Sequence, residues 1–134
     1  FWGSSLTSLR SLLAMALNLS TQDLDVVKRA THLDQSMVNH FLADQSNELR
    51  SKIVAASYIA VALGRDDELR DPFEDDPKWV NKIHEAGHAA AAEIKFEGMG
   101  RCHLIWRRQA EMLKEKYQIS WYSPAQMNPW MMFD

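Results

Sequence analysis

The sequence lacks several features that define specialised classes of protein. It holds one cysteine, Cys102, in 134 residues, so no internal disulfide can form. This favours a reducing compartment such as the cytoplasm. The longest apolar stretch, residues 53–63, is interrupted by Ser57 and Tyr58. It is shorter than the ~20 residues that cross a bilayer, which predicts no membrane span. Residues 1–5 lack a charged segment followed by an apolar core, so we expect no signal peptide there.

An excess of positive charge is also absent. The chain carries 15 Lys and Arg against 18 Asp and Glu, a net charge of −3. Affinity for nucleic-acid phosphates comes from clustered basic residues, so this balance argues against a general polyanion binder. The fractions of apolar residues, 46%, and charged residues, 25%, are those of a globular protein.

Strand patterns are almost absent, and apolar residues instead recur at spacings of three and four. We therefore predict an all-α fold: one domain, residues 1–134, built as a bundle of about six helices. An extended, irregular aromatic tail, residues 118–134, follows the last helix. The helices are expected at about residues 5–18, 21–32, 35–41, 46–63, 77–97 and 101–117.

The helix boundaries follow from start and stop signals. Short polar side chains satisfy the free amides of a first turn, and glycine readily ends a helix. Ser20 followed by Asp23 resembles a capping box, and Asp76-Pro77 combines a cap with proline at the first helical position. The other expected signals are Asp34 and Asp44 as N-caps, Gly64 as a helix end, and Gly98 with Gly100 as a tight reversal.

A five-residue motif in the fifth expected helix suggests chemistry. His84-Glu85-Ala86-Gly87-His88 resembles the HExxH motif of zinc metallopeptidases, and its wording is similar to that of the membrane-anchored AAA proteases. Histidines four apart share a helix face and can bind Zn²⁺. The resemblance implies that His84 and His88 are ligands, that Glu85 is the general base, and that the chain is a zinc-dependent hydrolase.

Helical phase favours a packing interpretation of the same segment. A catalytic zinc needs a third protein ligand, and Glu111 is the candidate by spacing across a helical hairpin. Glu111 lies about 140° from Trp106, on the apolar stripe of the last helix, and should face water. The small residues of the motif would then let another helix approach closely. The expected apolar positions are Trp79, Ile83, Ala86, Ala90 and Ile94 on the fifth helix, and Trp106, Ala110, Leu113 and Tyr117 on the sixth.

The second and third helices have the spacing of a helix-turn-helix, which suggests a DNA-binding regulator. Gln35, Ser36, Asn39 and His40 would face the major groove. Residues 21–50 carry three basic and five acidic side chains. The positive charge that would position a recognition helix on DNA phosphates is therefore missing. We expect no nucleic-acid binding.

The tail is dense in large apolar side chains, which a folded protein should place on a docking surface. They can wrap their own domain or dock on a second subunit. We favour a non-enzymatic helical domain that acts through protein–protein contacts, needs no cofactor and forms a homodimer through the tail. The expected interface residues are Trp121, Tyr122, Trp130, Met131, Met132 and Phe133. The alternatives are a zinc-dependent hydrolase and a helix-turn-helix regulator.

Overall fold

The computed structural model describes Leu17 and residues 19–134, and it divides the chain into two compact units at the boundary between Glu68 and Leu69. These residues form six α-helices and one 3-10 helix, with no strand among them, which confirms the predicted all-α fold. None of the described helices is long and apolar enough to cross a membrane. The helix expected at 5–18 lies outside the described residues, and the single domain remains a prediction.

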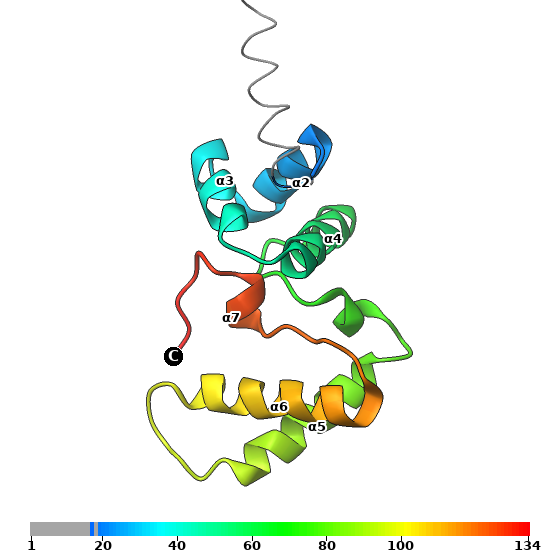
Figure 1. Ribbon diagram of the computed structural model, residues 1–134, viewed down its shortest axis with the longest axis vertical. Helices are drawn as coiled ribbons and strands as arrows, with labels where there is room; N and C mark the ends of the chain where they lie inside the picture. The colour runs from blue at the N-terminus through cyan, green and yellow to red at the C-terminus, as the bar shows by residue number, and fades with distance from the viewer. Residues whose placement is uncertain (1–16, 18) are drawn as a thin grey trace, which may run out of the picture. The chain divides into compact units, whose positions relative to one another are not determined.

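Unit 1 contains helices α2 (Thr21–Thr31), α3 (Gln35–Ala43) and α4 (Asn47–Leu63), and α2 packs against both α3 and α4 (Figure 1). Its core is aliphatic because each helix turns branched side chains inward. The most deeply buried members are Val27, Val38, Leu42 and Ile53.

Local caps fix the helix boundaries of unit 1. The Ser20 hydroxyl accepts from the Asp23 amide at 3.0 Å, and the Asp23 carboxylate accepts from the Ser20 amide at 3.2 Å, so the predicted capping box is present. Asp34 caps α3 as predicted. The prediction for Asp44 was wrong. Ser46 directly precedes the first residue of α4 and accepts from the amide of Leu49, while Asp44 ends α3.

Unit 2 contains the 3-10 helix η1 (Pro72–Asp75) and the helices α5 (Val80–Glu93), α6 (Arg101–Tyr117) and α7 (Pro124–Met127). The helices α5 and α6 form the predicted hairpin (Figure 1). Ile83 and Leu113 meet between them, together with Ile119 and Trp121. The predicted apolar positions Trp79, Ala86, Trp106, Ala110 and Tyr117 pack around this cluster.

Both ends of α5 differ from the prediction. Asp76 still acts as a start signal, but its carboxylate and carbonyl oxygens cap a turn over Pro77–Trp79, and the helix proper begins at Val80. The helix ends at Glu93 rather than near 97, because Ile94 is extended. The Arg101 guanidinium donates to the carbonyls of Ala91 and Ile94, which satisfies the free oxygens of that helix end.

The tail, predicted to be irregular, holds a short helix. Ser123 and Gln126 form a capping box around α7, and Pro124 stands at its first position.

The tail is held in place by buried polar groups. The Asn128 amide group accepts from the backbone amide of Leu69 and donates to its carbonyl, each at 2.8 Å. The buried Asp71 carboxylate accepts from the amide of Tyr122 at 2.8 Å.

Candidate functional sites

The three motif residues His84, Glu85 and His88 are all exposed on α5. Glu111, the expected third ligand, is exposed as its phase predicted. Its carboxylate lies 3.2 Å from the guanidinium of Arg108, which also binds Glu93. Within residues 19–134, no group of three His, Cys, Asp or Glu side chains is arranged to hold a metal ion. The described part of the chain therefore does not join these four residues into one zinc site.

The glycine inside the motif has a packing role. A Cβ atom at Gly87 would lie 3.0 Å from Nε2 of Gln109 on the facing helix α6. That nitrogen donates to the carbonyl of Ile83 at 2.9 Å, and Gln109 is buried. The absence of a side chain at Gly87 thus lets a polar side chain cross the helix interface, which supports the packing interpretation. No pattern in the sequence indicated this role for Gln109.

One partly buried carboxylate lies close to the motif. Glu74 of η1 accepts a hydrogen bond from the indole Nε1 of Trp121 at 3.2 Å. Burial raises the pKa of Glu74 above its usual range, and the neighbouring charge of Asp71 acts in the same direction. The Trp121 hydrogen bond and the electrostatic influence of Arg70 and His84 lower the pKa, but burial has the largest effect.

The proposed DNA-reading face of α3 is partly engaged within its own helix. Gln35 donates to the side-chain oxygen of Asn39 at 3.0 Å, and both residues are only partly exposed. His40 packs edge-on against Phe41, and Ser36 is exposed. The absence of nucleic-acid binding stays a prediction.

A hollow of about 820 Å³ lies in unit 1 between α2 and α4. Its walls carry charges of both signs, Asp25 with Lys28 and Arg29, so it offers no single electrostatic preference. Tyr58, which also lines the hollow, donates to the Asp23 carboxylate at 2.8 Å, and this hydrogen bond raises the pKa of the phenol.

The predicted interface residues of the tail differ in exposure. Trp121 is 5% exposed in the core of unit 2, while Tyr122 and Trp130 are half-buried. Met132 is 96% exposed, and Met131 is also exposed. Only part of the predicted interface set is therefore accessible to a partner.

The last residues dock on the start of α6. The carbonyl of Phe133 lies 2.8 Å from Nε2 of His103, and its ring packs edge-on against Trp106. The amide of Gly100 donates to the carbonyl of Asp134 at 3.2 Å. These contacts bring residues 131–134 to the tip of the α5–α6 hairpin.

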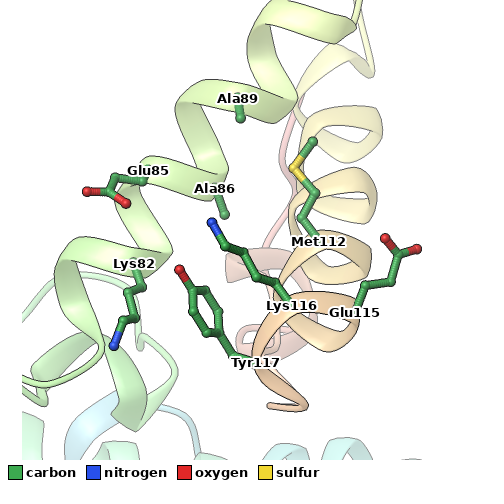
Figure 2. Close-up of a pocket in the computed structure, with 8 residues that line it drawn as sticks. All are labelled: Lys82, Glu85, Ala86, Ala89, Met112, Glu115, Lys116 and Tyr117. Carbon is green, nitrogen blue, oxygen red and sulfur yellow. The ribbon is translucent and has the colours of Figure 1, made fainter.

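A groove of about 450 Å³ lies between α5 and α6 (Figure 2). Ala86, Ala89 and Met112 supply apolar surface, since two small side chains on α5 face a flexible one on α6. The polar residues that line it are Lys82, Glu85, Glu115, Lys116 and Tyr117. No pattern in the sequence predicted this groove.

Comparison of the chain with protein-family models, with curated proteins and with solved structures yields no match.

Proposed function

We propose that this chain is a non-catalytic helical protein that acts through protein–protein contacts and pairs with a second copy of itself. The observation that carries the proposal is a set of exposed apolar side chains in unit 2. Met99 is 81% exposed and Met132 is 96% exposed, so two large apolar side chains are left almost entirely in water. Phe96 and Met131 are also exposed. We call these four residues the methionine patch.

Two contacts, one between backbone groups and one from a side chain to the backbone, support treating the patch as one surface. The hydrogen bond from Gly100 to Asp134 joins the residue after Met99 to the segment that carries Met132. The contact between His103 and Phe133 holds the same segment in place. Methionine is flexible and polarisable, which suits a contact surface that adapts to its partner.

The proposal narrows the interface expected from the sequence. The indole of Trp121 belongs to the core of unit 2, so a deletion of residues 118–134 would remove core packing along with the patch. Point substitutions at the exposed methionines are the sharper test, because they leave the buried contacts of the tail unchanged.

The test is sedimentation equilibrium on the full chain with Met99→Ser, Met132→Ser and both together. We expect the wild type to form dimers and the double variant to be monomeric at the same concentration, with no change in the urea midpoint of unfolding. Leu63→Ser is the matched control, because Leu63 is 63% exposed in unit 1. A wild type that is monomeric at about 500 µM, above the range of weak specific complexes, overturns the proposal.

Metal analysis separates this proposal from the zinc hydrolase. The expected result is no stoichiometric zinc after purification in zinc-containing buffer. Zinc retained by the wild type and lost in His84→Ala and His88→Ala would establish a metal site instead. Only then would the hydrolytic activity of Glu85→Gln be informative.

A further inference from the structure

The floor of the α5–α6 groove is suited to one unbranched apolar side chain. Ala86 and Ala89 face Met112 across the space between the helices, and the open volume is about 450 Å³ (Figure 2). Small residues on one wall and a flexible residue on the other leave room that can adjust to a guest. A linear side chain such as methionine fills a shape of this kind with little strain.

Two lysines near Tyr117 line the groove. The ammonium group of Lys82 lies 5.3 Å from the centre of the Tyr117 ring, and that of Lys116 lies 5.5 Å from the same ring. Among the described residues, neither lysine forms an ion pair with a carboxylate. The Lys116 side chain extends toward α5, whereas the carboxylates of Glu85 and Glu115 point outward (Figure 2). The groove therefore fits an apolar side chain followed closely by an acidic one.

The chain carries this pattern in its own tail. Met132 is 96% exposed, and Asp134, two residues later, is exposed as well. Contacts with Gly100 and His103 hold this segment at the beginning of α6. Lys116 is thirteen residues beyond His103 on the same helix, a distance of about 20 Å at 1.5 Å per residue. A tail docked in this way cannot fill its own groove.

We propose that Met132 of one copy occupies the α5–α6 groove of a second copy, with Asp134 facing Lys82 and Lys116. The inference rests on the proposed self-association and names the surface that receives the methionine patch. The two contacting surfaces differ, and a two-fold arrangement closes the assembly when each copy both donates and receives a tail. The assembly is then a dimer with two tail contacts.

Charge reversal on the full chain tests the polar half of the contact. Lys116→Glu and Asp134→Lys are each expected to raise the dimer dissociation constant about threefold to tenfold, because each places like charges together. The two substitutions in one chain exchange the charges and should restore the wild-type constant. Lys114→Glu is the control, since this exposed lysine lies on the same helix but outside the groove.

Groove filling tests the apolar half. Ala89→Gln places a longer side chain in the groove at an exposed helical position, so the fold should survive, and unchanged far-UV circular dichroism would verify this. The dissociation constant should rise about tenfold, as for Met132→Ser. The two substitutions together should add little, because they remove the same contact.

The outcomes separate this inference from the proposed function. If Met132→Ser disrupts the dimer while Ala89→Gln and Lys116→Glu leave it intact, the groove is not the receiving surface, and self-association still stands. Equal effects of Lys116→Glu and Lys114→Glu, without restoration by the charge exchange, also overturn the inference. A wild type that stays monomeric overturns both proposals. Binding of decanoate to such a monomer, lost in Ala89→Gln, would assign the groove to a small amphiphile.

Discussion

The caps that fix the helix starts of unit 1 and the polar contacts that fasten the tail of unit 2 have very different ranges along the chain. In unit 1, each helix start is capped by a side chain three residues away from its partner amide, and the core is aliphatic. In unit 2, the polar contacts that fasten the tail join residues 47, 51 and 59 positions apart, and the core includes an indole ring. Local chemistry thus accounts for the helix boundaries of unit 1, whereas the tail of unit 2 depends on distant partners.

The largest expected effect of a single substitution concerns the distant contacts. Asn128→Ala removes two hydrogen bonds to Leu69 and one to Pro124, and it leaves the backbone groups of Leu69 without partners. We expect unit 2 to lose about 3 kcal/mol of stability. Urea unfolding followed by tryptophan fluorescence measures it. Asn81→Ala, at an exposed position on α5, is the control, and equal losses in both variants would refute the role of Asn128.

A smaller effect is expected from a local cap. Ser46→Ala removes the hydroxyl that accepts from the Leu49 amide, and such a cap contributes about 1 kcal/mol. Hydrogen exchange resolves the effect by region. Protection should fall at the start of α4 and stay unchanged in α6. An equal loss of protection in α6 would contradict the expectation that this cap stabilises only its own helix start.

Substitutions at Gly87 and Gln109, which meet between α5 and α6, should have non-additive effects on the free energy of unfolding. Alanine is a better helix former than glycine by about 1 kcal/mol, but its Cβ would press on Gln109. We expect Gly87→Ala to leave stability nearly unchanged in the wild type and to raise it in a Gln109→Ala background. A double-mutant cycle of urea unfolding energies gives the difference. An identical effect of Gly87→Ala in both backgrounds would contradict the close approach.

The smallest effect is a pH dependence at Glu74. Burial raises the pKa of this carboxyl above its ordinary value of 4.5, so the folded state holds the proton more tightly than the unfolded state. Ionisation of Glu74 therefore lowers the free energy of unfolding as pH rises through its raised pKa. Glu74→Gln can still accept from Trp121 without burying a charge. Its advantage in urea midpoint over the wild type should grow from pH about 4 to about 7, with Glu48→Gln as an exposed control. A constant difference would contradict the pKa shift.

Helical phase and caps predicted much of what the structure contains. Ser20, Asp34 and Gly64 mark helix ends in unit 1 as expected, and Ile83 and Leu113 meet in the hairpin as their phase indicated. These properties depend on residues within a few positions of one another, which a single sequence displays.

The candidate sites were harder to predict because they depend on tertiary placement. Nothing in the composition of the tail shows that Trp121 is buried while Met132 is exposed. Asp71 stands before a proline, as Asp76 does, so its cap was detectable, but its bond to Tyr122 was not. The groove lies between α5 and α6, and the close approach of these helices at Gly87 and Gln109 is a tertiary contact that the sequence does not display.

The hydrogen bonds between Leu69 and Asn128 also affect how the protein folds during synthesis. The contact from Arg101 to Ala91 closes a span of 10 residues, whereas the contact from Asn128 to Leu69 closes one of 59. Bringing the ends of the longer span together costs roughly 1.6 kcal/mol more chain entropy. During synthesis, the α5–α6 hairpin can form as soon as α6 leaves the ribosome, but Asn128 must emerge before the tail can close over Ile83. Until then that core is open to water and to any chaperone nearby.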